Sequence, residues 1–427
     1  MVRQFEISAP RSHGFFAGIV FASIFLLAVV GDRFGSADID SSLFRGLHIA
    51  DVLFPVVCWV VLKKPQLAIN ALGRPLLIAS LGWLFFSTTL GLSGYLVTGF
   101  FTKAEVLAGI AFALKEMEFI AFFFVSAIVG LLRPMLFIRT LFFAGVILFV
   151  WLIIELNAPS GYYFIGLPFE KGPSQTGAVF ALLGTALIVA PMAAGFNQGC
   201  RFYQMLGVVM LIGAILSLSR SAILGVAFSG VLMITGYRSR VLFPLVITLS
   251  VLIIALYFVP SPLQETLRDL MYVRWTDVDL HAGYRVDKWE ELLGFLAANP
   301  LLLPFGAGLG SPNYLVLGPD LGLLLAVDSA FVRRVFEVGI IGSLVYATFL
   351  FVMCRVITTR DSSFAVISLL AIMLGSGVTL ESFQVSQTAL LFFGLAGGFI
   401  GIARRHQETD PSYMSVHSRH NSKLHEL

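Results

Sequence analysis

The sequence predicts an all-α membrane protein, a polytopic bundle of about 12 transmembrane helices with one long outer loop. Two observations predict this class. Of the 427 residues, 58% are hydrophobic and only 12% are charged, with a mean hydropathy of +0.90, whereas about a quarter of the residues of soluble domains are charged. The apolar residues also form continuous blocks, which is typical of helical spans and not of the ten-residue alternation of membrane strands.

Each long apolar block predicts one span, because a bilayer core of roughly 30 Å needs about 20 helical residues. The first block follows Arg3 and Arg11 but is not followed by a small-residue cleavage site, so we expect an uncleaved span. In chain order, the expected spans are residues 14–31, 47–62, 75–94, 105–131, 134–155, 175–194, 203–218, 221–236, 241–259, 337–354, 363–380 and 386–403.

The seventh and eighth spans meet at Arg220, in the run LGVVMLIGAILSLSRSAILGVAFSGVLMI. One helix through this run would hold an arginine at the bilayer centre, which costs at least ~2.5–3.5 kcal/mol. Two spans that turn at Arg220 leave its guanidinium at a membrane face, where its planar donors suit phosphate oxygens. We therefore expect a turn at Arg220 and a lipid-borne phosphate as its first candidate ligand.

The basic residues of the short loops predict the orientation, because Lys and Arg concentrate on the cytoplasmic side. This rule puts both termini in the cytoplasm, and Arg220 and the stretch 260–336 outside. The domains expected from this layout are spans 1–9 (1–259), a long periplasmic loop (260–336), spans 10–12 (337–403) and a disordered cytoplasmic tail (404–427). The inner side receives Arg3, Arg11, Lys63, Lys64, Arg74, Arg133, Arg139, Arg201, Arg238, Arg240, Arg355, Arg360, Arg404 and Arg405.

The long outer loop contains two amphipathic stretches that we expect to lie along the membrane surface and to cover a cavity between the spans. Asn299-Pro300 ends the second stretch, and the glycine-rich run LLLPFGAGLGSPNY follows it. The first stretch has the apolar residues Leu263, Leu267, Leu270 and Met271 on one face; the second, over 285–298, has Val286, Trp289, Leu293 and Leu296.

Two arginines of the outer side are candidates for binding a diphosphate. Arg220 and Arg285 could clamp such a group and neutralise the charge that grows as a sugar–phosphate bond breaks. Simpler roles remain open, because Arg220 could reach lipid headgroups and Arg285 could pair with glutamates on its own helix.

The run AVDSAFVRRVFEVGIIG contains a further group of candidates. Asp328 with Ser329 has the pattern of a helix N-cap, and Asp328 could instead act as a general base at the membrane face. Arg333 and Glu337 are spaced i, i+4 and predict an ion pair, which leaves Arg334 able to face a phosphate.

Charged residues also lie within the predicted span 105–131. Lys115 and Glu118 are spaced i, i+3 and can neutralise each other, whereas Glu116 lies on another face without a local partner. Ionisable residues at this depth face a bundle interior or a cavity, so both structural packing and proton or substrate handling stay open.

The chain lacks the sequence patterns of phosphate-binding loops, dinucleotide folds and zinc sites, and its net charge of +3 is too small to suggest nucleic acid. Cys58, Cys200 and Cys354 imply no disulfide framework. The pairs Asp38–Asp40 and Asp277–Asp279 are weak candidates for a divalent cation, so we expect no cofactor and no metal.

Three motifs together resemble the O-antigen ligase/polymerase superfamily. They are SLSRSAILGV around Arg220, GYRVDKWEELLGFLAANPLLLPFGAGLG with Tyr284 and Arg285, and VDSAFVRRVFEVGIIG with Asp328 and Arg334. Their order, spacing and shared outer location carry the resemblance, which covers roughly residues 205–345.

The resemblance implies a metal-independent inverting glycosyltransferase of the bacterial inner membrane that acts on undecaprenyl-diphosphate-linked oligosaccharides. It implies that Arg220 and Arg285 hold the diphosphate, with Tyr284 and Arg334 as further substrate-binding candidates and Asp328 as the candidate base. Ligases of this group have a histidine where this chain has Asp328, which favours a polymerase of O-antigen, capsule or exopolysaccharide. Its expected partners are membrane lipid, a chain-length regulator and a flippase.

Three alternatives stay open. An O-antigen ligase would transfer glycan to lipid A-core or to another acceptor. A lipid-linked oligosaccharide flippase or a secondary transporter would use Lys115, Glu116 and Glu118, although the two related halves common in transporters are missing from the sequence. A glycosyltransferase that uses undecaprenyl-phosphate sugars would use Asp38 and Asp40.

Overall fold

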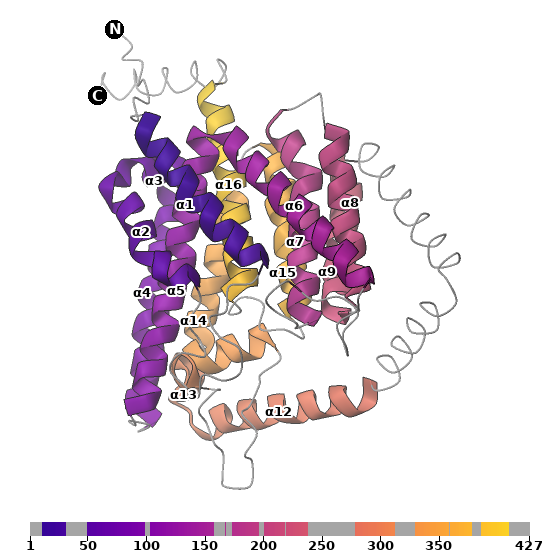
Figure 1. The fold of residues 1–427 in the computed structure, drawn as a ribbon. Helices are drawn as coiled ribbons and strands as arrows, with labels where there is room; N and C mark the ends of the chain where they lie inside the picture. The colour runs from indigo at the N-terminus through magenta and orange to yellow at the C-terminus, as the bar shows by residue number, and fades with distance from the viewer. Residues whose placement is uncertain are drawn as a thin grey trace, which may run out of the picture.

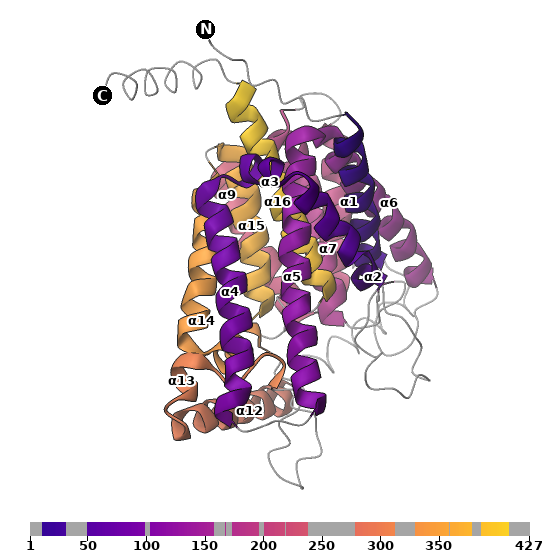
Figure 2. The ribbon, with the colours of Figure 1, turned by 90° about the vertical axis from the view of Figure 1, so that its left-hand side faces the viewer.

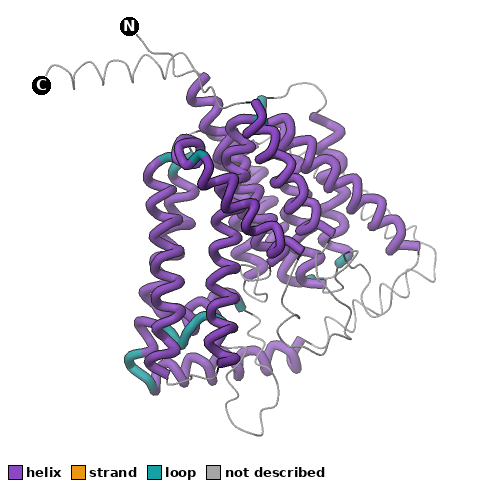
Figure 3. The backbone as a smooth tube through the Cα atoms, turned by 60° about the vertical axis from the view of Figure 1, so that its left-hand side comes forward, coloured by secondary structure: helices purple, strands orange, loops and turns teal. Residues whose placement is uncertain are grey.

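The computed structural model describes residues 11–30, 49–98, 103–157, 167, 173–195, 200–217, 219–237, 278–311, 329–357, 359–377 and 386–409. In these residues the regular structure is helical (Figure 3). The helices are α1 (Arg11–Val30), α2 (Ile49–Lys63), α3 (Pro65–Leu72), α4 (Arg74–Thr98), α5 (Lys103–Leu132), α6 (Pro134–Asn157), α7 (Pro173–Ala193), α8 (Cys200–Leu216), α9 (Arg220–Tyr237), α12 (Val278–Ala298), α13 (Leu302–Phe305), α14 (Ala330–Arg355), α15 (Arg360–Gly377) and α16 (Ser386–Thr409).

A helix coincides with every predicted span except 241–259, which lies outside the described residues, as does the first amphipathic stretch of the outer loop. Among the described helices, six are long and apolar enough to cross a membrane. The number becomes seven if α2 and α3, bent by 84° at Lys64, form one span. The described part of the chain therefore has the helices of a multi-pass membrane protein, and the total of about 12 spans stays a prediction.

Three boundaries differ from the prediction. Helix α3 occupies the short basic loop expected between two spans, because Leu67, Ala68, Ala71 and Leu72 give it a buried face. Helix α12 begins at Val278 instead of residue 285. Helix α16 continues through 404–409, where a disordered tail was expected, and residues 410–427 lie outside the described part of the chain.

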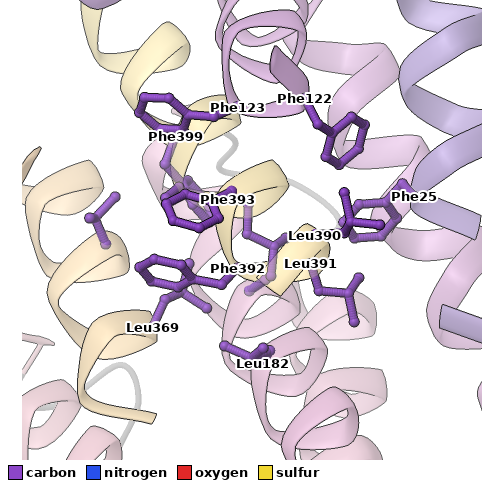
Figure 4. Packing of buried hydrophobic residues seen from close by; sticks show 14 of the residues in the cluster. Phe25, Phe122, Phe123, Leu182, Leu369, Leu390, Leu391, Phe392, Phe393 and Phe399 are labelled. Carbon is purple, nitrogen blue, oxygen red and sulfur yellow. The ribbon is translucent and has the colours of Figure 1, made fainter. Parts of the chain in front are cut away.

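The core of the bundle is built around α5, α7 and α16. In the most apolar stretch of α7 and in that of α16, 94% of the residues are buried inside the bundle. In the corresponding stretch of α4, the buried share is 33%. Phenylalanines of α5 and α16 fill the space between the helices, with the Phe123 and Phe393 rings 6.1 Å apart (Figure 4). Large side chains on the outer helices, such as Phe85, Phe143 and Leu344, are exposed instead, as expected for a surface that faces lipid.

Glycines allow α5 and α16 to approach closely. A Cβ atom at Gly401 would lie 2.7 Å from the backbone nitrogen of Leu131 and closer still to the carbonyl oxygen of Ala127. We expect Gly401→Ala to separate the two helices and to destabilise the bundle by about 1–3 kcal/mol, the usual effect of overpacking. Thermal unfolding of the purified chain measures this change. Gly82→Ala is the control, because nothing lies within 4 Å of a Cβ there; equal melting temperatures of the two variants would contradict the prediction.

The two ends of the bundle differ in composition. At one end, the last turns of α16 hold three loops together: Arg404 donates to Leu72 O at 3.4 Å, Arg405 donates to Leu132 O at 3.4 Å, and His406 lies 3.0 Å from Ala193 O. All three loops belong to the side that the basic residues predict to be cytoplasmic. At the other end, α12 lies across the bundle with α13 at its edge (Figures 1 and 2).

Candidate functional site

Arg220 is the first residue of α9, directly after a tight turn. Helix α8 ends at Leu216, and Ser219 caps α9: its Oγ accepts from Ala222 N at 3.3 Å and its carbonyl accepts from Ile223 N at 3.0 Å. The predicted turn at Arg220 is therefore confirmed. The side chain of Arg220 lies outside the described part of the structure.

Helix α12 carries Tyr284 and Arg285, whose side chains also lie outside the described part. Its second half packs on the bundle through Leu292 and Leu296, which are fully buried. The predicted apolar stripe is right for Leu296 and Trp289 but wrong for Leu293, which is 43% exposed. The buried position is Leu292, one residue before the predicted Leu293. Leu292 packs with Leu302 and Phe336.

The glycine-rich turn 306–311 follows α12 and α13, and together the three form what we call the roof. Gly306, Gly308 and Gly310 all have positive φ angles, which glycine adopts readily. Leu309 N donates to Gly91 O of α4 at 3.1 Å, and Ala307 N donates to Phe336 O of α14 at 2.7 Å. The turn therefore joins the roof to two helices of the bundle.

Helix α14 is broken at Gly339 (φ 69°, ψ −175°), and this break leaves two of its backbone carbonyls free to accept hydrogen bonds from the glycine-rich turn. We call residues 330–338 the leading segment of α14. A regular helix would use the carbonyls of its last turn internally, but here Phe336 O and Glu337 O accept from Ala307 N and Gly308 N. Gly339 itself faces α13, where a Cβ would lie 2.5 Å from Phe305 N.

The leading segment has its polar face toward the bundle and its apolar face toward the roof. Arg333, Arg334 and Glu337 are at most 4% exposed. Val332, Val335 and Phe336 pack against the roof with Leu292 and Leu296. This arrangement is the reverse of a surface helix, whose charged face meets solvent.

Arg333 and Glu337 form the ion pair that their spacing predicts. Arg333 Nε donates to Glu337 Oε1 at 2.8 Å, and the same oxygen accepts from Gly310 N at 2.9 Å. The Arg333 guanidinium also lies 5.1 Å from the centroid of the Phe112 ring of α5. One carboxylate thus holds both the leading segment and the glycine-rich turn.

Arg334, by contrast, pairs with a residue 218 positions away. Its Nη2 donates to Glu116 Oε1 of α5, and Trp83 Nε1 of α4 donates to Glu116 Oε2 at 3.2 Å. The guanidinium carbon lies 5.0 Å from the centroids of the Trp83 and Tyr346 rings, within the range of cation–π attraction. The partner that Glu116 lacked in its own sequence neighbourhood is therefore supplied by α14.

Lys115 and Glu118 pair as predicted, with Lys115 Nζ 3.1 Å from Glu118 Oε2. Lys115 also pairs with Asp51 of α2, a partner that the spacing did not indicate. Lys115, Glu116 and Glu118 therefore all take part in ion pairs. Buried pairs of this kind hold helices in register, and removing one partner is strongly destabilising.

The predicted site residues divide into two groups. Arg220 and the α12 residues Tyr284 and Arg285 belong to the end of the bundle that carries the roof (Figure 1). Asp328 lies outside the described residues, next to Ser329 at the N-cap position of α14. Ser329 makes no side-chain capping bond; its Oγ lies 3.4 Å from Gly377 O of α15.

Sequence reasoning missed Trp83, Tyr346 and Asp51 as neighbours of the buried charges. A tryptophan and a tyrosine within predicted spans were the available signal, because their polar atoms require partners in a membrane.

One family comparison covers this part of the molecule. Residues 205–347 match a family model described as O-antigen ligase, and no match was found among curated proteins. The matched segment contains the α8–α9 turn, α12, the glycine-rich turn and the leading segment. The resemblance that the three motifs predict is thus confirmed.

Proposed function

We propose that this chain is a membrane glycosyltransferase that polymerises undecaprenyl-diphosphate-linked oligosaccharide repeat units at the outer face of the bacterial inner membrane. The observation that carries the proposal is that one O-antigen ligase match encloses both Arg220 and Arg285. Arg220 opens α9 and Arg285 lies in α12, at the same end of the bundle (Figure 1).

The proposed chemistry is the transfer of a glycan from a diphosphate to an acceptor hydroxyl. Arg220 and Arg285 bind the diphosphate and stabilise the charge that develops as it leaves, and Tyr284 contacts the substrate beside them. Asp328 accepts the proton of the acceptor hydroxyl. Arg334, the fourth candidate ligand of the substrate, is already engaged by Glu116, so we assign the diphosphate to the other two arginines. The residues proposed for this reaction require no metal ion.

The proposed orientation follows from the basic loops. The loops that α16 holds together carry the lysines and arginines expected in the cytoplasm, and the roof is at the other end. Both termini are then cytoplasmic, and the roof meets glycans that a flippase has delivered to the outer face. A chain-length regulator is the further partner that a polymerase of this kind would need.

The ligase is the nearest alternative, because the family match does not separate polymerases from ligases. Asp328, in the position where ligases have a histidine, favours the polymerase. The transporter alternative depended on unexplained charges in α5, and these charges now have partners: Asp51 and Glu118 for Lys115, and Arg334 for Glu116.

Deleting the chain tests this assignment. We expect the deletion strain to accumulate single lipid-linked repeat units that have reached the outer face, and to lose polymer on gels and in mass spectra. Repeat units trapped at the inner face would indicate a flippase. Long polymer that stays on its lipid carrier and never reaches lipid A-core would indicate a ligase, and either result would contradict the proposal.

A further inference from the structure

The leading segment of α14 (residues 330–338) contacts the bundle through buried charges as well as through Ala330 and Val338, which belong to the bundle core. Val332, Val335 and Phe336 face the roof, and two buried charges meet α5: Arg333 lies beside Phe112, and Arg334 pairs with Glu116. The orientation of the segment relative to α5 therefore depends in part on buried polar contacts.

The two parts of α14 do not form one continuous helix, because the helix is broken at Gly339. Gly339 has φ 69°, and the carbonyls of Phe336 and Glu337 bond to the roof instead of to the next helical turn. A glycine with positive φ at such a break permits a change of direction that a continuous helix would not.

The Glu116–Arg334 pair connects this separate segment to the central helix α5. Both carboxylate oxygens of Glu116 are used, one by Arg334 and one by Trp83 of α4. The Arg334 guanidinium lies 5.0 Å from the centroids of both the Trp83 and the Tyr346 rings, which contact each other with centroids 4.5 Å apart. The pair thus joins α4, α5 and both parts of α14 at one buried point.

We infer that Glu116 and Arg334 are positioning residues for the proposed transferase, and this inference rests on that function. Their ion pair fixes the leading segment, which begins directly after the N-cap Ser329 and holds the roof through Glu337. Arg334 then acts through the geometry of the site, without contacting phosphate. Breaking the pair releases the segment, and the roof that the segment holds loses its place on the bundle.

The test uses the full chain in membranes, with its native cysteines replaced and Ser329→Cys as a reporter. Ser329 is 2% exposed, so a thiol there reacts slowly with a maleimide as long as the segment is held. We expect Glu116→Gln and Arg334→Gln each to raise the labelling rate by about tenfold, the equivalent of one charged hydrogen bond. Polymer made by the same variants without the reporter, measured per amount of the chain in the membrane, should fall by a similar factor.

The swapped pair, Glu116→Arg with Arg334→Glu, should restore slow labelling and polymer, which loss of general stability would not explain. The swapped pair also tests the inference if a single variant fails to insert. A swapped chain that inserts into the membrane but is labelled fast at the Ser329→Cys reporter would overturn the inference. Glu118→Gln is the matched control, since it breaks a buried pair of α5 that does not involve α14.

The inference and the proposed function fail in different ways. Unchanged labelling in Glu116→Gln, or fast labelling with normal polymer, overturns the positioning role. Normal polymer in the Arg220 and Arg285 variants described below overturns the transferase itself, whatever the labelling shows.

Discussion

Replacing Arg220 with alanine is expected to abolish chain extension while the protein still inserts. Without Arg220, the charge that develops on the diphosphate loses a preorganised bidentate donor, and losing one such donor lowers rates by about 10²–10³-fold. Arg285→Ala should have a similar effect, because the two guanidinium groups are proposed to share one ligand. The measurement is polymer length on gels from a deletion strain that carries each variant, with the membrane level of the protein as reference.

Arg220→Lys separates charge from geometry. Lysine keeps the positive charge but lacks the planar fork, so we expect it to restore little polymer. Arg201→Ala is the matched control for Arg220: this exposed arginine lies in the first turn of α8, at the other end of the same pair of helices. Glu290→Ala, exposed on α12, is the control for Arg285. Polymer of normal length in either arginine-to-alanine variant would rule out the proposed diphosphate clamp.

Replacing Glu337 with alanine is expected to give the largest loss of stability. Glu337 is fully buried, and its Oε1 accepts from both Arg333 Nε and Gly310 N. Removing one partner of a buried ion pair costs about 3–5 kcal/mol, because the remaining charge stays in a low-dielectric interior. We expect a clear fall in the melting temperature of the purified chain and faster proteolysis within the turn 306–311.

Two further variants define the cause. Glu337→Gln keeps an oxygen acceptor for Gly310 N and should lose less stability than the alanine variant. The double variant Arg333→Met with Glu337→Leu removes both charges and should recover stability relative to Glu337→Ala, since apolar pairs replace buried ion pairs well. If Glu337→Ala melted like the wild-type chain, the carboxylate would not be what holds the roof.

The sequence alone predicted the features that depend on neighbouring residues. The helices coincide with the apolar blocks because insertion of a span depends on its own length and hydropathy. The turn at Arg220 followed from the cost of a buried charge, and the pairs Arg333–Glu337 and Lys115–Glu118 followed from helical spacing. The family resemblance was also visible in the motifs, because they are contiguous runs of sequence.

Only the tertiary structure decided which helix faces meet. The Glu116–Arg334 pair joins residues 218 positions apart, and Asp51–Lys115 joins α2 to α5. The leading segment directs its charges inward, a reversal that periodicity cannot reveal because a helical pattern defines a polar face but not its neighbour. The segment ends at the break at Gly339, where the carbonyls of Phe336 and Glu337 accept from the glycine-rich turn. Contacts between distant segments depend on how the whole bundle closes, and no local pattern contains that information.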